Sequence, residues 1–459
     1  MSGGGNTMGL DTPQRLAVDA LLDDLKTRII VCCGAGGVGK TTTAAALGVR
    51  AAERGRKVVV LTIDPARRLA QSMGIDSLDN TPRRVEGVDG DGGELHAMML
   101  DMKRTFDEIV EAHADRERAR AILANPFYQS LSAGFAGTQE YMAMEKLGQL
   151  RAKDDWDLIV VDTPPSRSAL DFLDAPKRLG SFLDGKFIRV LMAPAKVGGR
   201  AGMKFLNVGM SMMTGTLSKL MGASLLKDVQ TFVAAMDTMF GGFRTRADAT
   251  FRLLQAPGTA FLVVAAPEPD ALREAAYFVE RLAAESMPLA GLVLNRVHGS
   301  DARQLSAERA LAAAENLEEG GIVDQEPGKA GLRDATDDGS PAVDDVDGDA
   351  ESYAEDVDSA ERAEHAERAE DAGHARDAEG TGSTGAGPGD ADAVTAGLLR
   401  LHAERMQVIA REQRTRDRFT SLHPEVAVAE VAALPGDVHD LAGLRAIGER
   451  LAAGVPAGA

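Results

Sequence analysis

The residue types and spacing most able to do chemistry occur in one glycine-rich stretch near the N-terminus. It reads Gly34-Ala35-Gly36-Gly37-Val38-Gly39-Lys40-Thr41 and matches the pattern G-x-x-x-x-G-K-[ST]. Glycines let successive backbone N–H groups face phosphates, and the first turn of a following helix adds unpaired donors and the positive end of its dipole. The alternative is a glycine-rich turn that binds nothing. We predict a nucleotide site whose phosphate-binding residues are Gly34, Gly36, Gly37, Val38, Gly39, Lys40, Thr41 and Thr42.

The side chains that follow the glycines have separate expected roles. The lysine of such a loop reaches the β- and γ-phosphates, which assigns Lys40 to that contact. The hydroxyl after it binds Mg²⁺, which assigns Thr41 to the metal ion. The pattern therefore predicts ATP and Mg²⁺ as cofactors.

The elements around this loop must be a strand before it and a helix after it. An apolar β-branched run, Ile29–Val31, enters the loop, and an alanine-rich segment with high helix propensity leaves it. Two further apolar runs, Lys57–Ile63 and Trp156–Val161, each deliver a carboxylate at their end, Asp64 and Asp162. The carboxyl ends of parallel strands form the edge where doubly wound sheets bind ligands.

Asp162 occupies the position of a metal-binding aspartate on a buried strand. Such a carboxylate holds Mg²⁺ directly or through water in proteins with this loop. The alternative is a strand-end aspartate that caps the next helix. Together with the loop upstream, the position favours the metal role.

Additional strands are expected at Glu94–Leu100, Phe261–Ala265 and Gly291–Leu294. The last two end in Ala266-Pro267 and in Asn295-Arg296. Buried strands alternating with amphipathic helices predict a mostly parallel, doubly wound α/β sheet of the P-loop NTPase class, with right-handed crossovers.

Charge is distributed unevenly along the chain. Its 459 residues carry a net charge of −19, and Glu315–Asp392 alone holds 25 acidic against five basic residues. This segment has hardly any large apolar residue and is expected to be disordered. It is either an electrostatic arm for a basic partner or a solvated spacer. The predicted domains are an ATPase core in 1–311, with a helical subdomain at about 103–255, a disordered acidic insert in 312–395, and a helix, strand and helix in 396–459 that complete the core.

Several protein classes are excluded by composition. No signal-peptide pattern opens the chain and no long uncharged apolar run occurs, so a cytoplasmic protein, with at most transient membrane contact, is expected. The two cysteines, Cys32 and Cys33, are adjacent, which gives neither a zinc spacing nor a bridgeable pair. No nucleic-acid partner is expected.

A methionine-rich segment lies between Asp162 and the next strand. Phe187–Phe243 holds eight of the 18 methionines in the chain. Flexible thioethers suit a surface that accepts varied apolar shapes. The alternative is that these residues pack within a helical layer.

The order of the motifs resembles one family. TIDPARRLAQSMG, VVDTPPSRSALDFL, VAAPEP and LVLNRV follow the loop as they do in the ArsA-type anion-transporting ATPases. That family includes arsenite-efflux ATPases and guided-entry targeting ATPases for tail-anchored membrane proteins. The resemblance covers Arg28 to about Leu311 and resumes near Phe419–Leu451.

The resemblance implies roles for particular residues. The switch I aspartate, here Asp64, positions the attacking water and acts with Lys40 in catalysis. The switch II aspartate, here Asp162, lies at the metal ion with Thr41 and Asp64. Asn295 reads adenine, and Pro267 is a candidate for the wall of the base pocket.

Two departures from the family pattern affect the expected function. The family carries a second lysine after the first glycine of the loop, which reaches the partner's nucleotide across a dimer, and here that position is Ala35. The cysteine cluster of the arsenite branch and the zinc C-x-x-C of the targeting branch are both missing, which argues against arsenite transport.

The resulting prediction is a Mg²⁺-dependent ATPase that opens and closes as a dimer. It would act on a hydrophobic or membrane-associated client, such as a membrane protein, bound by the groove that the targeting branch forms in the methionine-rich region. The dimer is either a homodimer or a heterodimer with a paralogous ATPase subunit. The alternatives are a weakly catalytic, nucleotide-binding regulatory subunit and a partition or positioning ATPase.

Overall fold

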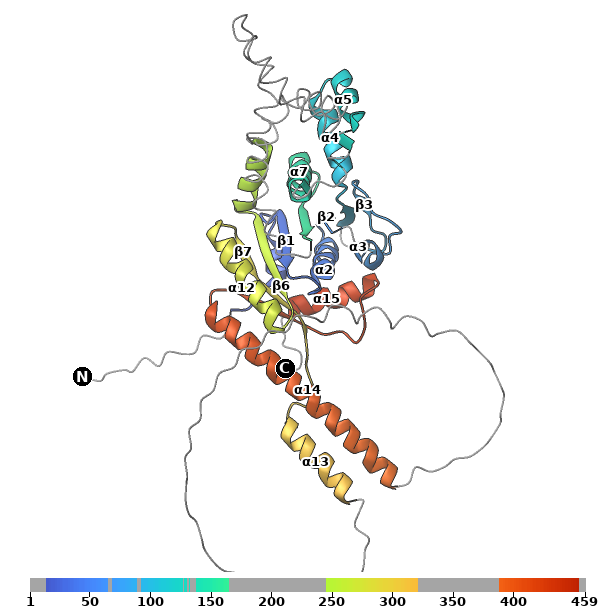
Figure 1. Ribbon diagram of the computed structural model, residues 1–459, viewed down its shortest axis with the longest axis vertical. Coiled ribbons are helices and arrows are strands. Elements are labelled where there is room, and N and C mark those ends of the chain that lie inside the picture. The colour runs from blue at the N-terminus through green and yellow to red at the C-terminus, as the bar shows by residue number, and fades with distance from the viewer. Residues whose placement is uncertain are drawn as a thin grey trace, which may run out of the picture. The chain divides into compact units, whose positions relative to one another are not determined.

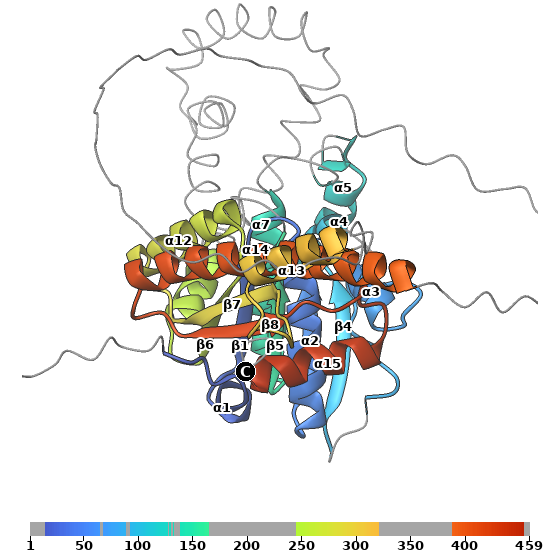
Figure 2. The ribbon, with the colours of Figure 1, turned by 90° about the horizontal axis from the view of Figure 1, so that it is seen from below.

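The protein is built on one eight-stranded sheet (Figures 1 and 2). The computed structural model describes residues 14–64, 68–88, 92–126, 128, 129, 132, 138–164, 245–320 and 388–453. The strand order is β3-β4-β2-β5-β1-β6-β7-β8. The strands are β1 (Ile29–Gly34), β2 (Lys57–Thr62), β3 (Arg83–Arg84), β4 (Glu94–Met99), β5 (Leu158–Asp162), β6 (Thr259–Ala265), β7 (Leu289–Val297) and β8 (Val428–Ala432).

The pairing between strands is parallel throughout, except where β3 pairs with β4. The expected α/β class and the mostly parallel sheet are therefore confirmed. The central strands β1, β5 and β6 are buried along their whole length, which explains their continuous apolar sequences. β5 lies between β2 and β1, so Asp162 ends beside the strand that leads to Asp64 and beside the strand that enters the loop.

Helices cover both faces of the sheet, as in a doubly wound fold. On one face, α1 (Val18–Asp23), α2 (Lys40–Glu53), α3 (Arg68–Ser72) and α15 (Leu441–Ala453) share an apolar core with the inward side of the strands. On the other lie α4 (Met102–His113), α5 (Arg116–Leu123), α7 (Thr138–Lys153), a helix at 245–255, α12 (Pro269–Ala284) and the C-terminal part of α14 (Pro388–Leu422). None of the helices in the described ranges combines the length and apolar character needed to cross a membrane.

The chain divides into two compact units. The first comprises Met1–Ala307 and Ala403–Ala459 and contains the sheet. The second comprises Glu308–His402, and its described residues belong to α13 (Ala307–Gly320) and to the first part of α14, which are joined by an ion pair between Glu318 and Arg400.

Two sequence predictions fall wholly or partly outside the described residues. The methionine-rich segment Phe187–Phe243 lies outside them entirely, and of the acidic insert only the two ends are described. Those ends differ from the prediction, because residues 312–320 continue α13 and residues 388–395 begin α14. Alanine, leucine and glutamate are strong helix formers, which accounts for helix at the N-terminal border of the acidic composition.

Candidate nucleotide site

The glycine-rich loop joins β1 to α2 at the centre of the carboxyl edge of the sheet (Figure 1). Gly34 has φ of +147°, and a Cβ there would lie 2.0 Å from the carbonyl oxygen of Val264 in β6. Gly39 has φ of +93°, and its Cβ would lie 2.2 Å from Nδ2 of Asn295. Both positions require glycine, because the backbone of the loop is packed against the two neighbouring strands on that side.

The remaining loop residues are arranged as a phosphate cradle requires. Gly36 and Gly37 are exposed, Val38 is buried, and Thr42 lies half-buried in the first turn of α2. Gly37 has φ of +75°, a left-handed conformation that favours glycine. The exposed glycines lead directly into the N-terminus of α2, whose first backbone N–H groups have no partner within the helix and suit an anionic group.

Lys40 begins α2 and is only 5% exposed. Its ammonium group donates a hydrogen bond of 2.6 Å to the carbonyl oxygen of Ala35. Burial lowers the pKa of Lys40, while the nearby charges of Asp162 and Asp64 act in the opposite direction. The structure thus brings this lysine together with both predicted aspartates, and the ammonium bonds a neutral carbonyl oxygen that a charged phosphate oxygen can replace.

Asp162 ends β5 and is completely buried. Its Oδ2 accepts hydrogen bonds from the hydroxyls of Thr41, at 2.7 Å, and Thr62, at 2.9 Å. Its Oδ1 is buried and has no hydrogen-bond partner. Burial raises the pKa of Asp162 to about 6, and the two threonine hydroxyls and Lys40 partly offset that rise.

These residues fit a magnesium ion. A buried carboxylate oxygen without a partner is costly unless a cation or an ordered water satisfies it, and Mg²⁺ prefers oxygen ligands and retains several waters. Thr41 and Asp162, which are in direct contact, are the side chains that would hold the ion or its waters. Elsewhere in the described part of the chain, His, Cys, Asp and Glu side chains form no group of three suited to a metal ion.

Asp64 follows β2 at the same edge of the sheet and is half-buried. Its backbone N–H donates to Oγ1 of Thr62 at 3.2 Å. The residue before it, Ile63, accepts a hydrogen bond of 2.8 Å at its carbonyl oxygen from Nε2 of Gln139 in α7. The backbone leading to Asp64 is therefore held both by the sheet edge and by a helix of the layer above it.

Asn295 lies near the end of β7 and is 7% exposed. Its Nδ2 donates a hydrogen bond of 2.9 Å to the carbonyl oxygen of Val38 in the loop. The pairing of β7 with β8 shifts register between Asn295 and Val297, and Arg296 between them has φ of +62°. This bulge sets the direction of the strand end, and the amide of Asn295 fixes the loop to it.

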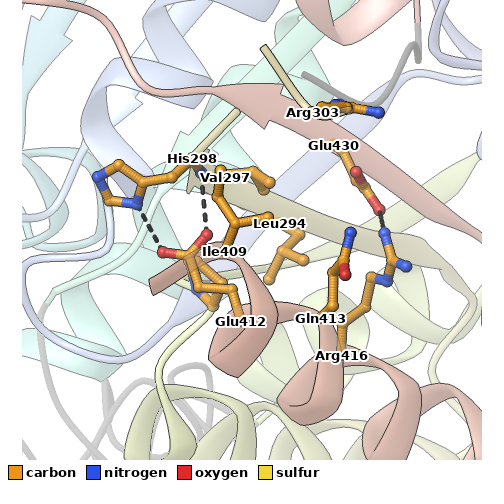
Figure 3. Close-up of a pocket in the computed structure, with 10 residues that line it drawn as sticks. Leu294, Val297, His298, Arg303, Ile409, Glu412, Gln413, Arg416 and Glu430 are labelled. Atoms are coloured by element: carbon orange, nitrogen blue, oxygen red, sulfur yellow. Dashed lines mark hydrogen bonds and ion pairs between the residues drawn. The ribbon is translucent and has the colours of Figure 1, made fainter. Parts of the chain in front are cut away.

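Pro267 lines a cavity whose lining residues do not include Asn295. The cavity has a volume of about 210 Å³ and is also lined by Leu294, Arg303 and residues of α14. Figure 3 shows this cavity, with His298 paired to Glu412 and Arg416 paired to Glu430. Leu294 and Asn295 are successive strand residues and so point to opposite faces of the sheet. The geometry therefore brings Asn295, but not Pro267, to the phosphate loop.

Sequence reasoning missed two residues of this site, Thr62 and Gln139. Thr62 stands two residues before Asp64 at the end of a predicted strand, and a hydroxyl at such a position is a local signal for a turn bonded to the next residues. Gln139 has no comparable signal. Its contact with Ile63 depends on how α7 packs.

Comparisons with known proteins agree with this geometry. A family model described as anion-transporting ATPase matches residues 27–319. ATPase GET3 of Podospora anserina is 25% identical over 308 residues, which cover 66% of this chain and 83% of that protein. ATPase GET3 of Malassezia globosa is 30% identical over 173 residues, and the putative arsenical pump-driving ATPase 2 of Aquifex aeolicus is 29% identical over 157. These two matches cover 38% and 34% of this chain and about half of each relative, 50% and 52%.

Proposed function

The chain belongs to the anion-transporting ATPase family, and we propose that it hydrolyses ATP to drive opening and closing of a dimer. Members of this family are P-loop ATP hydrolases that use ATP with Mg²⁺. The dimer would act on a hydrophobic or membrane-associated client. The observation that carries the hydrolytic part is the cluster at the carboxyl edge of the sheet. There Lys40, Thr41 and Asp162 meet the glycine loop, with Asp64 at the end of the neighbouring strand.

Each side chain has a task that its surroundings support. The loop N–H groups and the ammonium of Lys40 would bind the phosphates, and Thr41 with Asp162 would hold the metal ion. Asp64 is half-buried and next to a loop, where its carboxylate would orient and accept a proton from the attacking water. Asn295 would contribute to the base site from its position at the end of β7, where its amide bonds the loop. The metal ion supplies positive charge that stabilises the transferring phosphoryl group.

The proposals about the client and the dimer rest on the amino-acid sequence. The methionine-rich segment Phe187–Phe243 is the candidate client surface, since thioethers adapt to varied apolar shapes. We place the activity in the cytoplasm, with transient contact at a membrane when a client is delivered.

A second candidate follows from Ala35. Without the lysine that family members carry at this position, the chain is also suited to be a weakly catalytic, nucleotide-binding subunit of a heterodimer. Turnover of the purified chain, measured with and without a lysine-bearing paralogue, distinguishes the two.

The experiment that tests the assignment is nucleotide binding by Lys40→Ala. A fluorescent ATP analogue is titrated with Mg²⁺ into the wild type, Lys40→Ala and the control Lys153→Ala, whose lysine is exposed at the end of α7. We expect Lys40→Ala to lose about 100-fold in affinity, because the buried charge-assisted contact to the phosphates is removed. Lys153→Ala should bind as the wild type does. Wild-type affinity in Lys40→Ala would contradict the assignment.

A further inference from the structure

Thr62 lies between the two aspartates of the site. It is the last residue of β2 and pairs in parallel register with Asp162, the last residue of β5. Side chains at paired positions of neighbouring strands point to the same face of a sheet. Both residues are 0% exposed, so the hydroxyl of Thr62 has to find its partners inside the protein.

The hydroxyl forms a continuous chain of hydrogen bonds. The backbone N–H of Asp64 donates to Oγ1 of Thr62 at 3.2 Å, and Oγ1 lies 2.9 Å from Oδ2 of Asp162. Oγ1 also lies 3.4 Å from the carbonyl oxygen of Asp64. A hydroxyl has one hydrogen, and the carboxylate is both the nearer and the more strongly charged acceptor. The order is therefore Asp64 N–H to Thr62 Oγ1, and Thr62 O–H to Asp162 Oδ2.

This arrangement orients the carboxylate of Asp162. Two hydroxyls, from Thr41 and Thr62, bind Oδ2, whereas Oδ1 has no partner. The oxygen left over, Oδ1, is the one that remains free to bind a metal ion or its water. The hydroxyl of Thr41 is itself an expected ligand of that ion, so its role changes when the ion binds. Thr62 is therefore the partner of Oδ2 whose role stays the same with and without the ion.

The same hydroxyl fixes the start of the segment that carries Asp64. A threonine that accepts from the N–H two residues later closes a small turn, which sets the direction of the chain as it leaves the strand. Removal of the hydroxyl leaves that N–H without this partner and frees the carboxylate of Asp162 to rotate.

We propose that Thr62 is a positioning residue, whose hydroxyl holds Asp162 for the metal ion and transmits that orientation to the backbone of Asp64. The proposal rests on the proposed ATPase function and adds to it a direct physical link between the metal site and the aspartate that acts on water. Thr62 touches neither nucleotide nor water in this scheme and acts through the two aspartates.

The test compares Thr62→Val, Thr62→Ser and the control Thr105→Val. Valine has the shape of threonine and a high strand propensity but no hydroxyl, and serine keeps the hydroxyl. Thr105 in α4 is equally buried, and its hydroxyl bonds Oδ1 of Asn80 at 3.1 Å, away from the loop. For each protein, calorimetry gives the affinity for a non-hydrolysable ATP analogue in Mg²⁺ and in EDTA, and steady-state assays give kcat and KM.

We expect Thr62→Val to lose most of the increase in affinity that Mg²⁺ gives the wild type, with affinity in EDTA unchanged. Its kcat should fall about 10- to 100-fold, because a hydrogen bond to a charged group is lost at the stage where the aspartates act. Its KM for ATP in Mg²⁺ should rise in line with the lost affinity, since KM approaches the dissociation constant when chemistry is slow. Thr62→Ser should restore both properties. Thr105→Val should lower the melting temperature without altering the response to Mg²⁺.

Three results would overturn the proposal. The first is a wild-type response to Mg²⁺ and wild-type kcat in Thr62→Val. The second is a loss in Thr62→Ser as large as that in Thr62→Val, which would show that the hydroxyl alone does not account for the effect; Thr62→Ala replaces Thr62→Val in this comparison if the valine variant does not fold. The third is an equal change in Thr105→Val. Failure of the proposed function is distinct, since then the wild type itself would not bind the nucleotide.

Discussion

Asp64 and Asp162 end strands that are direct neighbours in the sheet, yet their surroundings differ. Asp162 is fully buried, shares its Oδ2 between two hydroxyls, and has a pKa raised to about 6 by burial. Asp64 is half-buried and stands where the chain leaves the sheet. A buried, hydrogen-bonded carboxylate suits a fixed metal ion, whereas one at the surface of a site suits a water molecule that is exchanged in every turnover.

We therefore expect Asp64→Asn to bind nucleotide and fail to hydrolyse it. The amide keeps the shape of the side chain but accepts no proton, so kcat should fall about 10²- to 10⁴-fold while affinity for ATP changes little. Stopped-flow binding and phosphate release measure the two effects separately. Asp76→Asn, at an exposed position after α3, is the matched control. A loss of affinity as large as the loss of rate would instead make Asp64 a structural residue.

At the scale of elements, six strands were predictable because each is a short apolar run with a distinct end: β1, β2, β4, β5, β6 and β7. The strand β8 was expected only from the family resemblance, and β3, which consists of two exposed arginines, was not predicted. The order of the strands was not predictable, because β5 follows β4 in sequence but inserts between β2 and β1. That insertion creates the contact between Thr62 and Asp162, which no local pattern contains. The glycine-rich loop, in contrast, is local in sequence, so the strand before it and the helix after it could be predicted from the sequence alone.

The end of β7 shows a second limit of sequence reasoning. The identity of Asn295 marked it as a candidate, but its direction depends on the bulge at Arg296, whose positive φ is unusual for a residue with a side chain. Pro267 was a candidate by its place after β6, and it lines the cavity shown in Figure 3 together with Leu294, the strand residue before Asn295. One residue of offset decides which face of a sheet a side chain reaches.

A pH effect on stability is expected from β4. Its His96 packs edge-on against Trp156, with ring centroids 4.8 Å apart, and its Nδ1 is buried without a partner. Burial lowers the pKa of His96, and the charges of Lys57 and Arg84 add to this effect while Glu94 opposes it. The unfolded chain then binds the proton more readily than the folded one. The free energy of unfolding should therefore increase as the pH rises toward about 6.5, the ordinary pKa of histidine, and should decrease at lower pH.

Thermal melts from pH 5 to 8 measure this contribution. Both His96→Phe and His96→Gln remove the titrating group, so both should flatten the dependence of the melting temperature on pH, although they differ in absolute stability. A wild-type slope in the two variants would show that His96 does not contribute to it.

At the scale of the whole molecule, the fold is expected to form without the acidic segment. The strands and the apolar cores lie in the unit formed by Met1–Ala307 and Ala403–Ala459. Glu318 and Arg400 are in contact, and α14 extends back from Arg400 to Pro388, about 18 Å at 1.5 Å per residue. A linker of about ten glycine and serine residues can therefore replace residues 321–387.

We expect this deletion to shift the melting temperature by no more than a few degrees and to leave ATP turnover nearly unchanged. The entropic cost of closing a loop grows only with the logarithm of its length, so shortening it alters the free energy of unfolding little. Calorimetry and a steady-state assay on the deleted protein measure both. A large drop in melting temperature would mean that the acidic segment packs against the rest of the protein.

The last prediction concerns Ala35 and the dimer. The family resemblance implies a lysine there that reaches the nucleotide of the partner, whereas this chain carries an alanine that is 9% exposed. A homodimer would then lack this lysine at both of its nucleotide sites. A heterodimer with a lysine-bearing paralogue would place one lysine at the nucleotide bound here. A cation that meets the developing charge of the phosphoryl group in this way is worth roughly 10³–10⁵ in rate.

We expect slow turnover by the isolated chain, strong stimulation by such a partner, and faster turnover after Ala35→Lys. Ala35 belongs to a buried apolar cluster, so a longer side chain at this position has to extend out of that cluster. Ala35→Met separates the effect of side-chain length from that of charge. Turnover should rise at least about tenfold in the lysine variant and not in the methionine variant. If Ala35→Lys is no faster, and size measurements show a homodimer that already works at full rate, the site completes its charge without a lysine from a partner.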